Sequence, residues 1–461
     1  MSAMQRAGEQ ISGTGAAARY AEAVPRYTSY PTAPHFHAGV TGETFRGWLA
    51  ETGQGDDLSL YVHIPFCDRL CWFCACHTKM TRRYEPVAAF LDALFCEIRT
   101  VGDILKGRGR FRALHFGGGS PTMLRADDIV RLGAALKRAF HFANDAEISV
   151  ELDPNDMDEA RFDALAEIGM TRASLGVQDF DPRVQKAINR EQTFEQTKAV
   201  VDGVRARGVR SVNLDLLYGL PHQTLQSVAD TIRRALTLSP DRIALFGYAH
   251  VPWFKKHQTM IDEAWLPGPE QRFEQQQETA RIIREAGYQA IGIDHFAKPN
   301  DPLAVAARQG RLFRNFQGYT EDACRTLIGL GPSSVSRLPQ GYAQNMPATT
   351  QYERMAREGN LATVRGIALS DEDHARAWVI ERLMCDFAFS GNEAVHRFGA
   401  CGQRIVAEAR TLVRERGIAS GLRENDGVFI VEDEARPLVR STAALFDQYL
   451  KRGGARHSVA V

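Results

Sequence analysis

The sequence predicts an α/β fold in which a parallel sheet is covered by helices, followed by a smaller and mainly helical domain. Between residues 59 and 293, short apolar segments alternate with longer segments whose apolar residues recur at helical spacing. Strict alternation of strand and helix implies parallel strands joined by helical crossovers. Beyond about residue 361 the alternation stops and helical segments predominate. We therefore expect one large sheet domain and a separate C-terminal domain.

The strands are predicted from short apolar runs, and the helices from apolar periodicity. Strands are expected at residues 59–65, 111–116, 147–152, 173–177, 212–217, 243–248 and 290–293. Helices are expected at residues 87–105 and 129–140, at a segment ending near Gly169, at a segment opened by the capping-box pair Thr193 and Gln196, and at residues 227–235 and 273–286. Six such units can curl into a full or partial barrel, but periodicity does not distinguish a barrel from a doubly wound sheet.

The chain is expected to have four parts. Residues 1–23 are predicted to be a flexible tail, residues 24–58 a mostly irregular N-terminal arm, residues 59–360 the barrel domain, and residues 361–461 the C-terminal domain. In the C-terminal domain, helices are predicted at residues 368–389, 404–416 and 435–451, and a short strand at residues 427–432.

The composition is that of an ordinary globular protein, with 44% apolar residues, 24% charged residues and a formal net charge of zero. A nucleic-acid partner is not expected, because nucleic-acid binders usually have an excess of basic charge. No stretch approaches the ~18 apolar residues of a membrane span. Residues 1–19 lack the apolar run of a secretory signal. We expect a cytoplasmic protein, and a monomer, since nothing in the sequence demands an oligomer.

Four of the eight cysteines are crowded directly after the first predicted strand, at Cys67, Cys71, Cys74 and Cys76. The first three have the spacing C-x3-C-x2-C. Iron–sulfur clusters take thiolate ligands, normally four. Three thiolates in one loop would leave one iron of a [4Fe-4S] cluster open, as catalytic metal sites generally leave a position open. We expect S-adenosylmethionine (SAM) to bind at that iron.

Two alternatives compete with a catalytic cluster. A structural zinc site would need a fourth ligand, which Cys76 or His77 could supply. Zinc sites usually use cysteine pairs with a long spacer, however, and no second C-x2-C pair follows. An electron-transfer ferredoxin would need a fourth cluster ligand and a small domain, and this chain is much longer than such a domain.

Glycine and polar residues follow the next predicted strands at the same end of the sheet. Gly117-Gly118-Gly119 follows the second strand, and a glycine backbone can approach a ligand closely. The polar residues at or near later strand ends are Glu151, Gln178, Arg190 and Asp215. Each alone is more often an ordinary hydrogen-bonded residue, but together they favour a ligand site. Carboxylates could bind the ribose hydroxyls or amino group of SAM, and an arginine its carboxylate.

Several motifs together resemble the oxygen-independent coproporphyrinogen III oxidase family. They are the cysteine loop with the preceding Tyr61-Val-His-Ile-Pro-Phe, then Pro25-Arg-Tyr-Thr-Ser-Tyr-Pro-Thr-Ala33, Phe116-Gly-Gly-Gly-Ser-Pro-Thr122, Glu151-Leu-Asp-Pro154, Gly176-Val-Gln178, Ile188-Asn-Arg190, Asp294-His-Phe-Ala297 and Arg314-Asn-Phe-Gln-Gly-Tyr319. The resemblance covers nearly the whole chain. It implies a partial (β/α)6 radical SAM barrel with a [4Fe-4S] cluster on Cys67, Cys71 and Cys74.

The resemblance also implies two SAM molecules bound side by side. Residues expected to contact the first are Tyr61, Gly118, Glu151 and Val335. Residues expected to contact the second are Phe73, Gly119, Ser120, Gln178, Arg190, Asp215 and Ala249. Cys76 matches an additional cysteine of the family that is linked to activity but is not a cluster ligand. Ser120 stands where the family is expected to have threonine, and the substitution keeps the hydroxyl group.

The activity implied by the resemblance is radical decarboxylation of two propionates of coproporphyrinogen III to vinyl groups, giving protoporphyrinogen IX. It requires an electron donor and an electron acceptor that the sequence does not identify. The four propionates of the substrate imply basic residues in the pocket, and Arg26 and Tyr30 are expected in a lid over it. A related haem-binding chaperone without decarboxylase activity is the alternative. Cys76 and the arm at residues 25–33 favour the enzyme, because such chaperones tend to lack both.

Overall fold

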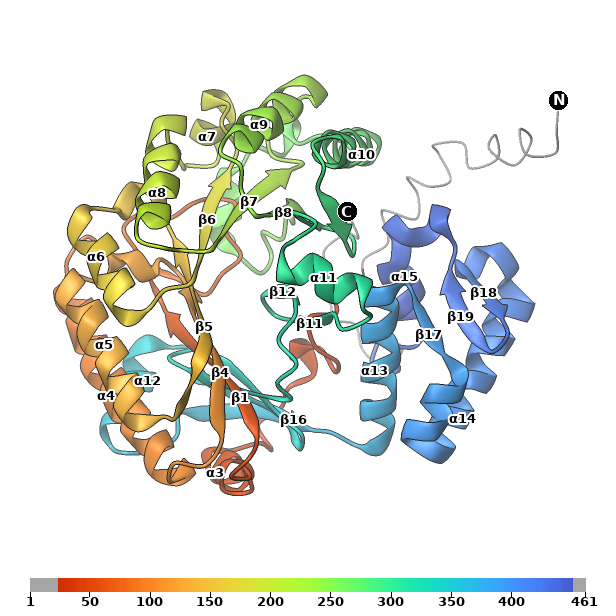
Figure 1. Cartoon of the computed structure of the whole chain (residues 1–461), viewed down its shortest axis with the longest axis horizontal. Helices are drawn as coiled ribbons and strands as arrows, with labels where there is room; N and C mark the ends of the chain where they lie inside the picture. Colours follow the sequence, from red (N-terminus) through yellow and green to blue (C-terminus); the bar gives the residue numbers. More distant parts are fainter. Residues whose placement is uncertain (1–23, 451–461) are drawn as a thin grey trace.

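The computed structural model describes residues 24–450, so the tail predicted at residues 1–23 lies outside the described residues. Its core is a 12-stranded sheet with the strand order β16-β15-β14-β13-β1-β4-β5-β6-β7-β8-β10-β9. Helices line the outer face of this sheet, and the C-terminal domain lies beside it, next to α11 (Pro302–Arg308) (Figure 1).

Six parallel strands form the centre of the sheet and confirm the first six predicted strands. They are β1 (Asp57–Ile64), β4 (Arg110–Gly118), β5 (Phe142–Leu152), β6 (Arg172–Gln178), β7 (Ser211–Tyr218) and β8 (Arg242–Gly247). They lie side by side in sequence order, whereas a doubly wound sheet reverses its order at a switch point. Because the two edge strands, β16 and β9, do not pair with each other, the barrel is open. The partial barrel is therefore confirmed.

The helices that follow these strands also match the predicted segments. They are α4 (Glu85–Leu105), α5 (Ala126–Ala139), α6 (Glu159–Ile168), α8 (Phe194–Ala206), α9 (Leu225–Thr237) and α10 (Pro269–Glu285), with the short α7 (Pro182–Ala187) before α8. The predicted capping box is present: Thr193 Oγ1 accepts from the Gln196 N–H at 3.0 Å, and Gln196 Oε1 accepts from the Thr193 N–H at 2.8 Å.

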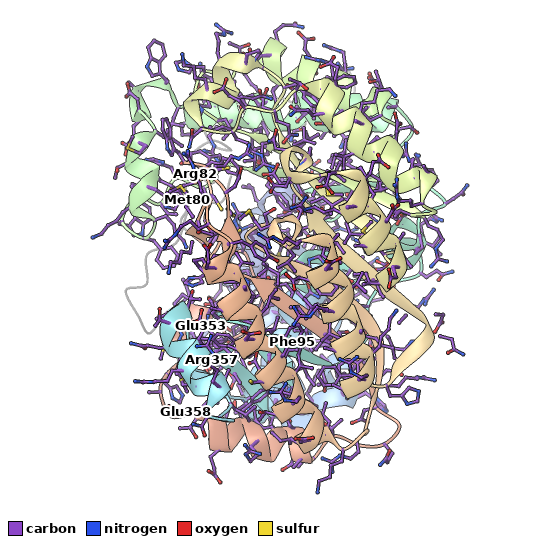
Figure 2. The ribbon with its side chains drawn as sticks, turned by 90° about the vertical axis from the view of Figure 1, so that its left-hand side faces the viewer. Met80, Arg82, Phe95, Glu353, Arg357 and Glu358 are labelled. Carbon is purple, nitrogen blue, oxygen red and sulfur yellow. The ribbon has the colours of Figure 1, made fainter. Side chains whose placement is uncertain are left out.

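Beyond β1 the sheet has four strands that the sequence analysis did not predict. They are β13 (Thr326–Leu330), which is parallel to β1, and the antiparallel β14 (Val335–Leu338), β15 (Gly341–Asn345) and β16 (Thr363–Ala368). Between the last two, α12 (Thr349–Arg357) packs on α4, and Figure 2 shows Glu353 and Arg357 of α12 alongside α4. The sheet thus continues past residue 360, where we predicted a domain boundary.

At the opposite edge, the predicted strand at residues 290–293 is confirmed as β9 (Gln289–Ile291). It pairs with β10 (His295–Ala297), which is antiparallel to β8. A separate hairpin of β11 (Phe313–Asn315) and β12 (Gly318–Thr320) follows α11.

The C-terminal domain has helices α13 (Asp371–Asp386) and α14 (Gly391–Arg416). They confirm helices in the segments predicted at 368–389 and 404–416, but α14 begins at Gly391, before its predicted start. The predicted strand is β19 (Val428–Val431), and it lies between β17 (Ala388–Ser390) and β18 (Leu422–Asn425), which were not predicted. The single helix predicted at residues 435–451 is wrong within the described residues. A 3-10 helix, η7 (Asp433–Leu438), leads into the short α15 (Val439–Ala444), and Pro437 accounts for the irregular start.

The N-terminal arm connects the two parts of the molecule. After η1 (Ala33–His35) it has one regular helix, α3 (Gly42–Ala50). Its first residues, Val24, Tyr27 and Tyr30, belong to the apolar core of the C-terminal domain. Two polar contacts hold them there: Tyr27 Oη donates to Asp447 Oδ2 at 3.0 Å, and Arg440 Nη2 donates to the Val24 carbonyl at 2.7 Å.

Among residues 24–450, no helix has the length and apolar character that a membrane crossing requires.

Candidate active site

The cysteine loop leaves the carboxyl end of β1 at the mouth of the barrel. It begins in β2 (Phe66–Cys67), which pairs with β3 (Lys79–Met80) at the end of the loop. The Lys79 N–H donates to the Pro65 carbonyl at 2.7 Å, and the Thr81 N–H donates to the Cys67 carbonyl at 2.9 Å. These bonds close the loop, so Cys67, Cys71 and Cys74 are held in one compact turn.

Donors from the protein face the sulfur atoms of this turn. The Cys76 N–H donates to Cys74 Sγ at 3.4 Å, and Arg190 Nη1 donates to Cys71 Sγ at 3.6 Å. Hydrogen bonding from Cys76 lowers the pKa of Cys74 to about 7. Burial raises the pKa of Cys71, and the Arg190 guanidinium opposes that rise. Such donors stabilise thiolates, the form that binds metal.

The ligand atoms of the cysteine loop do not form the tight group that a mononuclear zinc site needs. Ligands ~2.0–2.3 Å from one tetrahedral zinc lie less than about 4 Å from each other. Among the described residues, no three cysteine or histidine ligand atoms of this loop lie within 4.8 Å of one another. His77, the alternative fourth zinc ligand, uses Nε2 to donate to the Pro347 carbonyl at 2.7 Å. The wider spacing suits a cluster in which each thiolate binds a different iron.

The glycine turn after β4 packs directly on the start of the cysteine loop. The Gly119 N–H donates to the Ile64 carbonyl at 2.7 Å, and the Ser120 N–H donates to the Phe66 carbonyl at 2.7 Å. A Cβ atom at Gly119 would lie 2.5 Å from the Phe66 carbonyl oxygen. Gly118 has φ +112°, and a Cβ atom there would lie 2.6 Å from the His63 ring. This close approach of two backbones therefore requires glycine.

Replacing Gly119 with alanine is expected to destabilise the fold by about 1–3 kcal/mol, because the new methyl group meets rigid backbone. At Gly47, in the middle of α3, an added Cβ atom would have no neighbouring atom within 4 Å. Gly47→Ala is the matched control and should be neutral or stabilising by about 0.5–1 kcal/mol. Anoxic thermal unfolding of the two variants beside the parent protein checks this. Equal unfolding temperatures for both variants would contradict it.

Glu151, at the carboxyl end of β5, faces the glycine turn. Its carboxylate accepts from the Gly118 N–H at 3.1 Å and from His115 Nε2 at 3.1 Å. Burial acts to raise the pKa of Glu151, but the contacts with His115, Gly118 and His63 together outweigh burial and lower it. The Tyr61 ring stacks on His115 with centroids 5.8 Å apart. Tyr61 is also paired in register with Gly329, next to the Val335 carbonyl. The structure thus brings Tyr61, Gly118, Glu151 and Val335 together.

Arg190 and Ser120 contact both the cysteine loop and the segment after β5. Arg190 is buried, donates to Asp153 Oδ2 at 3.0 Å, and donates to the Gly176 carbonyl at 2.6 Å. Ser120 Oγ donates to Asp156 Oδ2 at 2.9 Å. Gln178, the last residue of β6, has φ +67° and its amide lies beside Arg190 at Gly176.

Asp215, Phe73 and Ala249 complete the predicted set. Asp215 accepts from Ser174 Oγ at 3.1 Å and from Asn213 Nδ2 at 2.8 Å, and burial raises its pKa to about 6. Gln258 Nε2 donates to the carbonyls of Phe73, at 2.9 Å, and Ala249, at 3.2 Å. That one amide therefore joins the cysteine loop to the end of β8.

The sequence analysis missed several side chains of the segment after β8 that hold the cysteine loop. His257 Nε2 donates to the Cys74 carbonyl at 2.7 Å, and Lys255 Nζ donates to the Cys76 carbonyl at 2.8 Å. Their position directly after a barrel strand is the signal that could have indicated them. His63 was also missed, although it donates to the His77 carbonyl at 2.9 Å; burial lowers its pKa to about 4.

A cavity of about 1090 Å³ lies between the barrel, the arm and the C-terminal domain. Its lining includes Tyr30, Arg314, Phe316, Val335 and Trp378. Phe316 packs edge-on against Tyr61, with centroids 4.6 Å apart, so one wall of the cavity adjoins the side chain of Tyr61. Pockets for large ligands have volumes of roughly 300–1,000 Å³, so this space is large enough for a tetrapyrrole-sized molecule.

The described geometry agrees with the comparisons with known proteins. The family model described as the radical SAM superfamily matches residues 61–235. The chain is 48% identical over 443 residues to the oxygen-independent coproporphyrinogen III oxidase of Paracoccus denitrificans (strain Pd 1222), an alignment that covers 95% of this chain and 96% of the relative. The chain belongs to the oxygen-independent coproporphyrinogen III oxidase family. This confirms the resemblance inferred from the motifs.

Other members of the oxygen-independent coproporphyrinogen III oxidase family agree with this assignment. The protein of that name from Bradyrhizobium diazoefficiens is 46% identical over 441 residues, covering 95% of this chain and 98% of the relative. The solved structure of coproporphyrinogen III oxidase (HemN) from Escherichia coli, described as a radical SAM enzyme, has 38% identity and a TM-score of 0.87. It covers 93% of this chain and 100% of that chain. The radical SAM superfamily implies a [4Fe-4S] cluster and SAM as the cofactors.

Proposed function

We propose that this protein oxidises coproporphyrinogen III without oxygen and converts two of its propionate side chains to vinyl groups, giving protoporphyrinogen IX. Each conversion releases CO2 and removes one hydrogen atom and one electron from the side chain. The observation that carries the proposal is the set of three free thiols in one loop at the barrel mouth, in a chain that aligns with a coproporphyrinogen III oxidase over 95% of its length.

Cys67, Cys71 and Cys74 would hold the [4Fe-4S] cluster and leave one iron for SAM. When bound, the two cofactors supply the one-electron chemistry that starts the reaction. The protein positions both and keeps water from the reacting atoms. The donors from Arg190 and Cys76 to the sulfur atoms would favour the thiolate form that binds iron.

Two adjacent SAM molecules are part of the proposal. The group of Tyr61, Gly118, Glu151 and Val335 would contact the first. The second would contact Phe73, Gly119, Ser120, Gln178, Arg190, Asp215 and Ala249. Support comes from the two groups meeting at the glycine turn, where the Gly118 N–H donates to Glu151 and the next residue, Gly119, packs on Phe66. Cys76, which has an exposed side chain two residues from Cys74, is proposed as a catalytic residue that is not a cluster ligand.

The Asp215 carboxylate is expected to make SAM binding depend on pH. Because its pKa is about 6, the carboxylate takes up a proton as the pH falls below that value. SAM affinity should then fall by up to about tenfold per pH unit in the parent protein. Asp215→Asn should bind SAM about 10- to 100-fold more weakly at pH 8, and should lose the pH dependence. Anoxic titration calorimetry between pH 5 and 8 measures both.

The matched control for this experiment is Asp230→Asn, on the exposed face of α9, where Asp230 pairs with Arg233. Asp230→Asn should keep the parent affinity and the parent pH profile. If Asp215→Asn and the parent protein have parallel pH profiles, Asp215 does not bind SAM as a carboxylate.

A haem-binding chaperone of the same superfamily is the second candidate. The arm and Cys76 favour the enzyme, and the arm packs into the fold at the rim of the cavity. Anoxic incubation of the reconstituted protein with coproporphyrinogen, SAM and a reductant should give 5′-deoxyadenosine and a divinyl product on chromatography. Tight haem binding without these products would favour the chaperone. A cytoplasmic location, a monomeric state, and separate electron donor and acceptor partners remain predictions.

A further inference from the structure

Four arginine side chains gather at the barrel mouth, beside Asp294 and Tyr218. We call Arg26, Arg272, Arg314 and Arg440 the arginine cluster. Arg26 lies close enough to Asp294, Tyr218 and Arg314 for their charges to shift its pKa. Arg26 and Arg314 in turn help burial to lower the pKa of Arg440. Burial and Arg26 lower the pKa of Arg272, and Tyr218 lies close enough to shift the pKa of both arginines. The four therefore form one region of positive charge, although they come from the arm, α10, β11 and α15.

Main-chain carbonyls accept most of the hydrogen bonds from the arginine cluster. Arg26 Nη2 donates to the Gly247 carbonyl at 3.1 Å, and Arg272 Nη2 donates to the Tyr248 carbonyl at 2.7 Å. Arg314 Nη2 donates to the Arg26 carbonyl at 3.3 Å, and Arg440 donates to the carbonyls of Val24 and Pro25. A carbonyl accepts a hydrogen bond but does not neutralise a charge, so these contacts leave the positive charges in place.

Other buried arginines of the protein have carboxylate partners. Arg242 contacts Asp301 at 2.7 Å and Glu321 at 2.6 Å, and Arg376 has two glutamates at 2.9 Å. Within the described part of the chain, by contrast, Arg26 and Arg272 have no carboxylate within 4.0 Å, and Arg314 has only Asp294, at 4.0 Å. Asp294 is also the acceptor of His295 Nδ1 at 2.6 Å. Arg26, Arg272 and Arg314 thus lack the close carboxylate partners that the protein gives to Arg242 and Arg376.

Several N–H groups of the arginine cluster have no acceptor among the described residues. They are Nε and Nη1 of Arg314 and Nε of Arg272. The Arg314 side chain is 4% exposed and lines the large cavity. Leaving a buried, charged N–H without an acceptor is costly, so a group of this kind indicates a missing partner.

Arg26 is exposed to solvent, and yet burial among protein atoms lowers its pKa. A side chain can be exposed to solvent and also have its pKa shifted by burial when it faces an enclosed chamber that water can enter. The same is true of Glu151, whose side chain is 41% exposed although burial acts to raise its pKa. Arg26 and Glu151 therefore face enclosed space at the barrel mouth, where a substrate must bind to reach the cofactors.

We propose that the arginine cluster is a carboxylate-binding site that holds propionate groups of the tetrapyrrole substrate. The inference rests on the proposed function, which supplies a ligand with four carboxylates. Guanidinium groups bind carboxylates through paired N–H donors, and the free N–H groups of Arg314 suit that geometry. The arm closes the site, because the main-chain carbonyls of Val24, Pro25 and Arg26 accept from Arg440 and Arg314.

The test compares binding of coproporphyrin III, an oxidised tetra-acid that carries the same propionates, with binding of its uncharged tetramethyl ester. Fluorescence titrations use the SAM-loaded holoenzyme without oxygen. Arg26→Gln and Arg314→Gln should each weaken binding of the tetra-acid about 10- to 100-fold. Binding of the ester should be the same in all proteins. Arg281→Gln is the matched control, since Arg281 is an exposed arginine on α10 that pairs with Glu278 and Glu285.

Two further measurements separate a binding defect from a folding defect. Iron content and reductive cleavage of SAM to 5′-deoxyadenosine, without substrate, should equal those of the parent protein. Arg26→Lys, which keeps the charge, should recover part of the affinity that Arg26→Gln loses. If both glutamine variants bind the tetra-acid as tightly as the parent does, the arginine cluster is not the site, even where the parent makes the vinyl product. If the parent binds the tetra-acid through these arginines but makes no vinyl product, the proposed function fails and the site stands.

Discussion

Replacing Cys71 with serine is expected to abolish the formation of the vinyl product and to remove most of the iron from the anoxically purified protein. Cys71 is buried in the turn that holds all three predicted cluster ligands, and its sulfur accepts from Arg190 at 3.6 Å. A serine hydroxyl is a poor iron ligand beside two thiolates, so the cluster loses a necessary bond. The activity should fall to the uncatalysed background, a loss of at least ~10⁶-fold for a typical enzyme. Iron and sulfide analysis and the visible spectrum measure the loss of iron, and an anoxic activity assay measures the loss of product.

The matched control is Cys401→Ser. Cys401 lies in α14 of the C-terminal domain, where it accepts from Arg404 on an exposed face. This variant should keep the iron content and the activity of the parent protein. Retained decarboxylation by Cys71→Ser, with the parent iron content, would exclude the proposed cluster ligands.

Replacing Arg242 with glutamine is expected to lower the free energy of unfolding by about 3–5 kcal/mol, the usual cost of breaking a buried ion pair. The Arg242 side chain is 2% exposed and contacts Asp301, which is 3% exposed, and Glu321. Glutamine would leave Asp301 buried without its cation. Because Arg242 begins β8, at the opposite end of the strand from the cysteine loop, the variant tests the fold without touching the site.

Anoxic urea unfolding followed by circular dichroism measures the change in stability. The matched control is Arg110→Gln, which removes an ion pair with Asp57 between side chains that are 49% and 43% exposed. That pair is worth at most about 1 kcal/mol. Burial acts to raise the pKa of Glu321, but Arg242 and Arg172 together outweigh burial and lower it. The ion pair of Glu321 with Arg242 therefore contributes its full stability above the ordinary carboxylate pKa of about 4.3. As the pH falls below that value, the difference in the free energy of unfolding between the parent and Arg242→Gln should narrow. Equal urea midpoints for the two variants would contradict the prediction.

The central barrel could be predicted because each unit has a local signal. The apolar run of β7 and the capping box at Thr193 each span only a few residues of sequence. Sequence pattern and structure therefore agree at both places. The strands β14 and β15 could not be predicted, because they are short and bury polar residues. Asn345 is an example, since its amide donates to Glu97 Oε1 at 2.6 Å, across 248 positions of sequence. Such a partner is not visible in a local pattern.

Some functional residues could likewise be predicted from a local sequence pattern, and others could not. The three cysteines and the three glycines are close in sequence, so their spacing indicated the chemistry. The arginine cluster could not be predicted, because Arg26 and Arg440 meet only after the barrel and the C-terminal domain have packed. His257 and Gln258 were missed for a related reason: they bind the cysteine loop through main-chain carbonyls, which carry no sequence signature.

The attachment of the arm to α15 also bears on how the protein is made. Val24 and Tyr27 have their polar partners at Arg440 and Asp447, so the earliest described residues of the chain pair with nearly the last. During translation the barrel strands leave the ribosome long before those partners exist. The arm cannot be fixed at the barrel mouth before residues 440–447 have been made, so we expect the cysteines to be accessible to iron–sulfur assembly until then.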